Sequence, residues 1–361
     1  MMSLISSPLL AQGVQNIEVH GYAQNRFWFN PSSTARFAVE RVSLSASAML
    51  PENRKAYIEY YFNPNVPPNT ATNVTNEEFR TYLESAYVDM PVGTGNLRVG
   101  KGRQLNFGIT PTYPNRKTTQ YGILSEAFTQ DRIVGAQYAY KKGLFDLGAS
   151  LYTDNTMGSK GQGAFPGAIP ASDIVSHFAD RDIPAEISGR LAESLKLGIT
   201  SGCLQAHISG ALGALSQTNL TSTNDFTGGF NSIYNTPNNT NTDHNKYGID
   251  ATYAKNNFVA QTEWYQGKFS FVQTTGYSIL FGYQPKDKPR AYIRYAAINN
   301  DQAPNANPLT WDIEQLTFGF VKPISKGIWV ELNYERNMER PGGGASSLDN
   351  DLLFAELFTG F

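Results

Sequence analysis

The sequence predicts an all-β fold, a transmembrane antiparallel β-barrel of about 16 strands. Apolar and polar residues alternate with a period of two in many segments. Short and long connections between these segments also alternate, as short periplasmic turns and long external loops would. Aromatic residues reach 12% and charged residues only 17%, which is typical of strands and turns. Residues 13–361 are expected to form a single barrel domain.

Charge and hydropathy exclude two other classes of protein. A net charge of −2 offers no broad basic field, so nucleic acid is not an expected partner. No apolar run reaches the roughly 18 residues of a membrane-spanning helix. Strands can still cross a bilayer here, because only every second residue of a barrel strand meets lipid.

Residues 1–12 are expected to be the remnant of a signal peptide or a disordered N-terminus. They hold a short apolar stretch, including Leu4, Ile5 and Leu9, followed by a polar segment. No Lys or Arg precedes that stretch, so the signal is incomplete.

Alternation is clear in residues 41–62, which predict a hairpin around residues 51–53. Val42 and Leu44 share one face of the first strand, whereas Arg41 and Ser43 share the other. The same analysis predicts strands at 16–29, 36–50, 54–63, 80–90, 96–106, 132–140, 144–153, 185–195, 203–213, 246–255, 258–267, 275–284, 289–298, 311–322, 327–337 and 351–361.

The connections support closure into a barrel. Short links are expected at 51–53, 91–95, 141–143, 196–202, 255–257, 285–288 and 323–326. The long ones are expected at 64–79, 107–131, 154–184, 214–245, 299–310 and 339–350, with shorter members at 30–35 and 268–274. A soluble β-sandwich gives no reason for loop lengths to segregate in this way. The terminal Phe361 resembles the last-strand signal that the outer-membrane barrel-assembly machinery recognises.

Several segments resemble the phosphate-selective porin family in the same order. They are 97–103 (LRVGKGR), 131–135 (DRIVG), 188–192 (SGRLA), 258–265 (FVAQTEWY) and 290–295 (RAYIRY). The resemblance implies a barrel of about 16 strands, commonly a homotrimer, in the outer membrane of bacteria. It also implies that the third external loop, residues 107–131, folds into the channel as a constriction.

Charged residues of this loop and of the polar strand faces are the candidate pore-lining and constriction residues. Opposed charges across a narrow lumen would orient polar solutes and select ions. These residues are Arg41, Lys55, Lys101, Arg103, Arg116, Lys117, Glu126, Asp131, Arg132, Arg190, Glu263 and Arg294. Leu97 and Val99 would share a face with Lys101 and Arg103, so a bulge at Gly100 and Gly102 is expected to turn one of those cations inward.

The sequence shows no catalytic motif, so an enzyme is not expected, nor is a cofactor or a resident metal. An external calcium site at Asp173, His177, Asp180 and Asp182 is a minor alternative. The expected function is a water-filled pore for small hydrophilic solutes and ions, with room for a weak anion preference. A mainly structural or surface-attachment barrel is the alternative. Lipid and lipopolysaccharide would be the surrounding partners.

Overall fold

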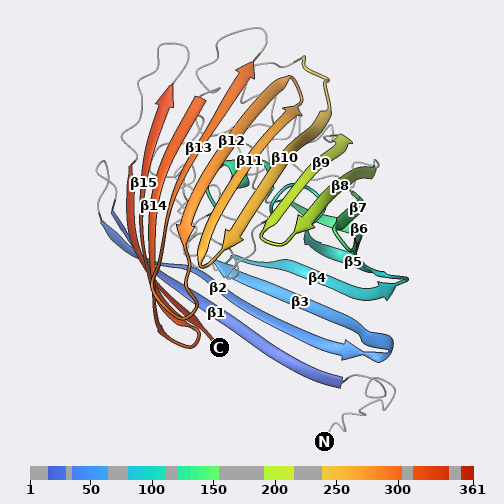
Figure 1. Cartoon of the computed structure of the whole chain (residues 1–361), viewed down its shortest axis with the longest axis horizontal. Coiled ribbons are helices and arrows are strands. Elements are labelled where there is room, and N and C mark those ends of the chain that lie inside the picture. Colours follow the sequence, from blue (N-terminus) through green and yellow to red (C-terminus); the bar gives the residue numbers. More distant parts are fainter. Residues whose placement is uncertain are drawn as a thin grey trace, which may run out of the picture.

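In a computed structural model, the chain forms a closed antiparallel barrel of 16 strands (Figure 1). The structure describes residues 15–29, 35–63, 80–110, 121–129, 131–153, 191–214, 238–302, 312–340 and 351–361. Each strand pairs with its neighbours in the sequence, and β1 pairs with β16 to close the ring. The predicted fold class is therefore confirmed.

The strand bounds follow the predicted ones closely, with one exception. The strands are β1 (Gln15–Phe29), β2 (Arg36–Leu50), β3 (Arg54–Asn63), β4 (Arg80–Val92), β5 (Gly95–Arg103), β6 (Arg132–Lys142), β7 (Phe145–Thr153), β8 (Leu191–Ser201), β9 (Leu204–Ala214), β10 (Asp243–Lys255), β11 (Phe258–Phe269), β12 (Val272–Tyr283), β13 (Arg290–Gln302), β14 (Asp312–Ser325), β15 (Ile328–Arg340) and β16 (Leu352–Gly360). The short helices are η2 (Pro51–Asn53) and α1 (Ile123–Phe128).

The exception is β8, which was predicted at 185–195 and lies six residues later. Its hairpin with β9 turns at Gly202 and Cys203, and Gly202 has a left-handed φ of +55°. The predicted link at 196–202 is therefore wrong, because Lys196 belongs to the strand. Residues 185–190 lie outside the described part of the chain.

Two faces of the barrel differ as the alternation predicts. Leu44, Ile58 and Tyr60 are each at least 40% exposed on the outer face. Arg41 and Tyr61, on the opposite face of the same hairpin, are 6% and 2% exposed. Apolar side chains thus meet lipid, and polar and aromatic side chains fill the interior.

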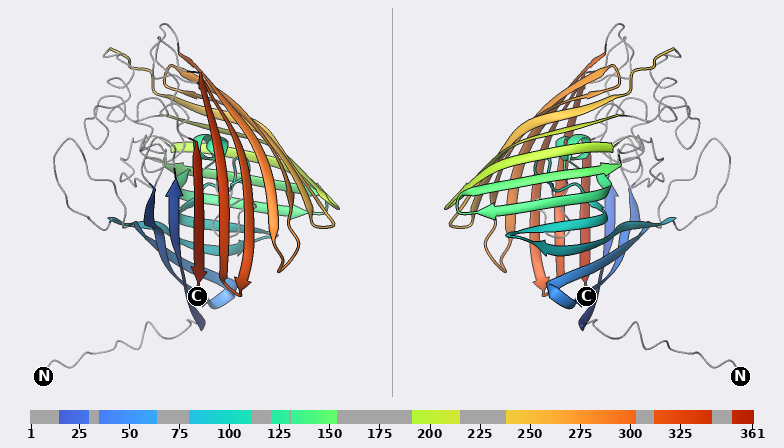
Figure 2. Two further views of the ribbon diagram at one scale, coloured as in Figure 1. Left: turned by 90° about the vertical axis from the view of Figure 1, so that its left-hand side faces the viewer. Right: turned by 90° about the vertical axis from the view of Figure 1, so that its right-hand side faces the viewer.

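The C-terminal strand completes the barrel wall. Phe361 and Gly21 exchange two backbone hydrogen bonds of 3.0 Å beyond the end of β16. Both lie at the end of the barrel where the short turns are, near the point marked C in Figure 2. In the described residues, no helix is long and apolar enough to cross a membrane.

The bulge predicted in β5 is wrong. The ladder from Gly95 to Arg103 is unbroken against β6, and it is unbroken against β4 as far as Lys101. The irregularity lies in β4 instead, where the register against β3 shifts at Glu84. An extra residue there lets both Glu84 and Ser85 become buried.

Candidate functional site: the barrel interior and the segment that enters it

The described parts of the connection between β5 and β6, residues 104–110 and 121–129, lie inside the barrel against its wall. Asn106 donates to the carbonyl of Ala149 at 2.8 Å, on β7. The backbone N–H of Gly108 donates to Ser209 Oγ on β9, and that of Ile109 donates to the Tyr265 hydroxyl on β11, both at 3.0 Å. The segment 104–110 therefore runs along the inside of β7 to β11. We call the described residues 104–110, 121–129 and 131 the inner segment.

Apolar packing fixes the inner segment to one wall. Phe107, Leu124 and Phe128 form a buried cluster with Tyr265 of β11 and Ile298 of β13. The ring centroids of Phe107 and Phe128 are 5.5 and 5.6 Å from that of Tyr265. Helix α1 contacts β12 and β13. This cluster buries apolar area inside a barrel whose other interior residues are largely polar, and it holds both limbs of the segment together.

Tyr121 of the same segment reaches a different wall. It belongs to a buried aromatic cluster with Tyr22 of β1, Tyr61 of β3 and Phe358 of β16. The Arg103 guanidinium lies 5.5 Å from the Tyr121 ring. Because β3 and β11 are eight strands apart in the ring of 16, the inner segment contacts opposite sides of the barrel.

Two arginines meet at the root of the inner segment. Arg103 and Arg132 are directly opposite each other on β5 and β6. Both bond to the carboxylate of Glu84, Arg103 at 2.8 Å, and all three side chains are buried. The bulge in β4 places Glu84 where it can receive both guanidinium groups. This arrangement concentrates positive charge on the wall at β5 and β6.

Two carboxylates meet on another wall. Asp250 of β10 and Glu263 of β11 are directly opposite each other and are 4% and 5% exposed. Asp250 Oδ1 lies 2.7 Å from His207 Nδ1 on β9. Glu263 accepts hydrogen bonds from Ser278, Gln261 and Tyr265 at 2.9, 3.1 and 3.0 Å. Negative charge therefore gathers on β10 and β11.

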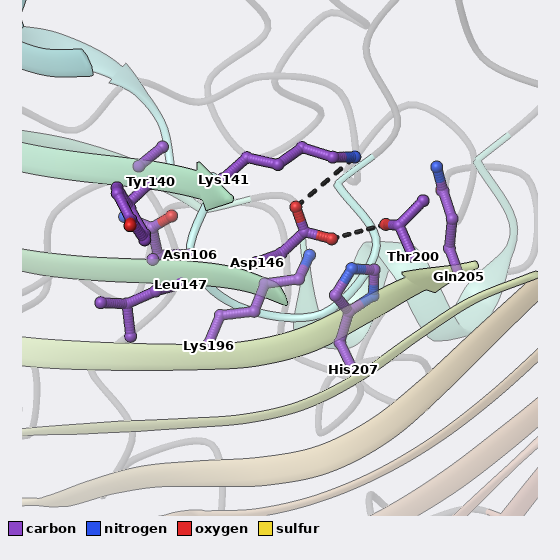
Figure 3. A pocket seen from close by; sticks show the side chains of 11 residues that line it. Asn106, Tyr140, Lys141, Asp146, Leu147, Lys196, Thr200, Gln205 and His207 are labelled. Atoms are coloured by element: carbon purple, nitrogen blue, oxygen red, sulfur yellow. Dashed lines mark hydrogen bonds and ion pairs between the residues drawn. The ribbon is translucent and has the colours of Figure 1, made fainter. Parts of the chain in front are cut away.

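A polar pocket of about 370 Å³ is lined by Asn106 of the inner segment and by residues of β6 to β9. Figure 3 shows Asp146 between Lys141 and Thr200, with His207 and Lys196 beside it. Asp146 accepts from Thr200 Oγ1 at 2.5 Å and lies 3.5 Å from Lys141 Nζ. Lys196 donates to the carbonyl of Gly108. The pocket is therefore lined by paired charges of both signs.

The remaining predicted site residues are distributed around the wall. Arg41 stacks 4.6 Å from the Tyr61 ring, and Arg294 donates to Thr317 and Gln315 at 3.2 and 3.4 Å. Lys55 lies opposite Asp89 on the inner face. Lys101 lies opposite Val134, a lipid-facing residue, so its side chain starts from the outer face. Arg116, Lys117 and Arg190 lie outside the described residues, as does the side chain of Glu126.

Two important residues were not among the candidates. Glu84 joins Arg103 and Arg132, and Lys246 of β10 bonds to Asp131. The sequence held a signal for the first, because the adjacent polar residues Glu84 and Ser85 interrupt the alternation of their strand. Lys246 had no such signal, because a lysine at a strand end usually reaches water.

No group of three or more potential metal ligands occurs in the described part of the chain. The candidate calcium residues 173–182 lie outside it, as do residues 1–12.

The barrel is similar to several solved outer-membrane proteins. OmpF of Salmonella typhi, in complex with daunomycin, has a TM-score of 0.66 at 10% identity, covering 96% of this chain and 97% of that one. The outer-membrane channel DcaP of Acinetobacter baumannii has a TM-score of 0.62 at 10% identity, covering 97% and 98%. An anion-selective porin from Comamonas acidovorans has a TM-score of 0.54 at 12% identity, covering 96% and 99%. These likenesses show a shared fold.

A comparison with curated proteins gave no match. The sequence does, however, match a model of a protein family. The family described as "Phosphate-selective porin O and P" matches residues 23–309, which is most of the chain and includes the inner segment. The match agrees with the closed barrel, its apolar outer face and its polar interior. The chain therefore belongs to the phosphate-selective porin O and P family and is a channel of the bacterial outer membrane.

Proposed function

We propose that the channel passes small hydrophilic solutes and ions by passive diffusion, without a catalytic step, and that the inner segment is its constriction. The contact of that segment with opposite walls, through Tyr121 on one side and Phe107 and Leu124 on the other, carries the proposal. A chain that reaches both walls narrows the path for every solute. Polar groups lining the rest of the interior keep that path hydrated.

Selectivity for ions is proposed to be weak, with a small preference for anions. Several interior charges of the described residues are paired: Arg26 with Glu356 at 2.5 Å, Arg98 with Asp89 at 2.8 Å, and Lys246 with Asp131. The two arginines at Glu84 favour anions locally, and the carboxylate pair on β10 and β11 opposes them. Together these charges produce an electric field across the lumen rather than a potential of one sign throughout it. Such a field orients polar solutes. This arrangement does not favour strong selection of phosphate, the solute in the family description.

The proposed assembly is a homotrimer surrounded by lipid and lipopolysaccharide. OmpT of Vibrio cholerae, 13% identical, was solved in a trimer form. On this chain, Asn25 is exposed on the outer face between Val39 and Leu357. A polar amide there is more favourable against another subunit than against lipid. Phe361, 71% exposed beyond β16, is the proposed contact for the barrel-assembly machinery.

Planar-bilayer recording tests the constriction. Purified protein should give stable channel steps, and neutralising Arg116 and Lys117 together should move the reversal potential in a salt gradient towards cations. Neutralising Lys286 and Lys288, in the short turn between β12 and β13, is the matched control and should leave the reversal potential unchanged. A persistently silent bilayer would favour the structural or surface-attachment role instead. Unchanged selectivity in working channels would place the constriction elsewhere.

A further inference from the structure

Lys246 differs from the other interior lysines in what it contacts. Its ammonium donates to the backbone carbonyl of Phe128 at 2.7 Å and bonds to the carboxylate of Asp131. It also lies 4.5 Å from the centre of the Phe107 ring. Phe107 is on the limb of the inner segment that enters the barrel, whereas Phe128 and Asp131 are on the limb that returns. One wall side chain therefore touches both limbs.

The two wall positions directly opposite Lys246 provide no partner for its ammonium. They are Ala211 on β9 and Gly267 on β11, and neither has a side-chain hydrogen-bond acceptor. The Lys246 side chain is only 3% exposed. Removing an ammonium from water is unfavourable unless it is paired and hydrogen-bonded. Both of its hydrogen-bonding partners come from the inner segment.

We propose that Lys246 is a positioning residue for transport, a clamp that holds the inner segment at a fixed place in the lumen. The inference rests on the proposed role of the segment as the constriction. With the clamp in place, the Phe128 end of α1 and the start of β6 are tied to β10. Without its charge, the apolar cluster still attaches α1 to the wall, but the returning limb gains freedom to shift.

The test compares single-channel records of Lys246→Met, Lys246→Arg and Asp131→Asn. Methionine keeps most of the side-chain length without the charge, so Lys246→Met should raise open-channel current noise several-fold and change the mean conductance by about 2-fold. Asp131→Asn should do the same to a smaller extent, because the bond to the Phe128 carbonyl remains. Lys246→Arg should stay near wild type. The double variant Lys246→Met with Asp131→Asn should be no noisier than Lys246→Met, since the bond to Asp131 is already lost when Lys246 is replaced.

Lys268→Met is the matched control. Lys268 lies on the same hairpin, is about half exposed and bonds to Asp243 at 2.6 Å, away from the inner segment. Its channels should behave like wild type.

If Lys246→Met and Asp131→Asn insert as channels with wild-type noise and conductance, the clamp is refuted. If neutralising Arg116 and Lys117 leaves selectivity unchanged while the Lys246 variants are noisy, the proposed role of those two charges in selectivity fails, and the clamp on the inner segment is supported. If Lys246→Met does not assemble, Asp131→Asn alone decides.

Discussion

Two of the like-charged pairs inside the barrel, one basic and one acidic, are stabilised in different ways. Arg103 and Arg132 are directly opposite on neighbouring strands, an arrangement that repels, and a single carboxylate from Glu84 joins them. Asp250 and Glu263 are opposite in the same way, but Glu263 is surrounded by three neutral donors. The basic pair therefore shares one carboxylate, whereas the acidic pair is hydrogen-bonded by several neutral groups. Substitutions should affect the first far more than the second.

Glu84→Gln should have the largest effect. It removes the buried carboxylate that two opposed guanidinium groups share, and breaking a buried ion pair costs about 3–5 kcal/mol. The free energy of unfolding, measured by urea titration of the barrel in detergent or lipid, should fall by that amount. Glu52→Gln is the control: Glu52 pairs with Arg54 but is 72% exposed, and such surface pairs contribute about 1 kcal/mol or less. Equal unfolding midpoints for the two variants would contradict the comparison.

Sequence alternation was sufficient for the fold because each strand has one lipid-facing and one interior face. The hairpin of β2 and β3 shows this: Leu44 and Ile58 face outward, and Arg41 and Tyr61 face inward. Alternation predicts the wrong bounds for β8, because Lys196 suggests a turn although it lies within the strand. A lysine is compatible with the interior face of a barrel strand, so charge alone does not mark a strand end in this class of protein.

The candidate site was less predictable, because it depends on contacts between distant segments. Arg103, Asp131 and Arg132 were identified from their charge and position, but their partners, Glu84 and Lys246, were not. Alternation predicts that a bulge in β5 turns either Lys101 or Arg103 inward. Arg103 reaches Glu84 because the pairing of β5 with β4 ends at Lys101 and because the bulge lies in β4, at Glu84. Such relations are set by strand register, which a pattern of alternation does not determine.

Tyr265→Phe should have the second largest effect, because this hydroxyl links the acidic pair to the inner segment. It donates to Glu263 at 3.0 Å and accepts the backbone N–H of Ile109 at 3.0 Å. Losing it leaves the partly buried N–H of Ile109 without that acceptor, at a cost of up to about 1–3 kcal/mol, while the ring contacts with Phe107 and Phe128 remain. Urea unfolding measures the loss. Tyr247→Phe, a 51% exposed tyrosine on β10, is the matched control and should change little. A loss no greater than that of Tyr247→Phe would mean that the link is not needed.

Asp250→Asn should have the smallest effect on stability and a clear effect on selectivity. The amide keeps the shape of the carboxylate and its hydrogen bond to His207, and it removes the repulsion with Glu263. The lost charge and the relieved repulsion oppose each other, so the free energy of unfolding should change by less than about 1 kcal/mol. The reversal potential in a salt gradient should move towards anions, because one interior negative charge is gone. Asp243→Asn, at the 44% exposed end of the same strand, is the control for selectivity. A large loss of stability in Asp250→Asn would show that the acidic pair depends on its charge as strictly as the basic pair does, and would remove the difference between the two walls.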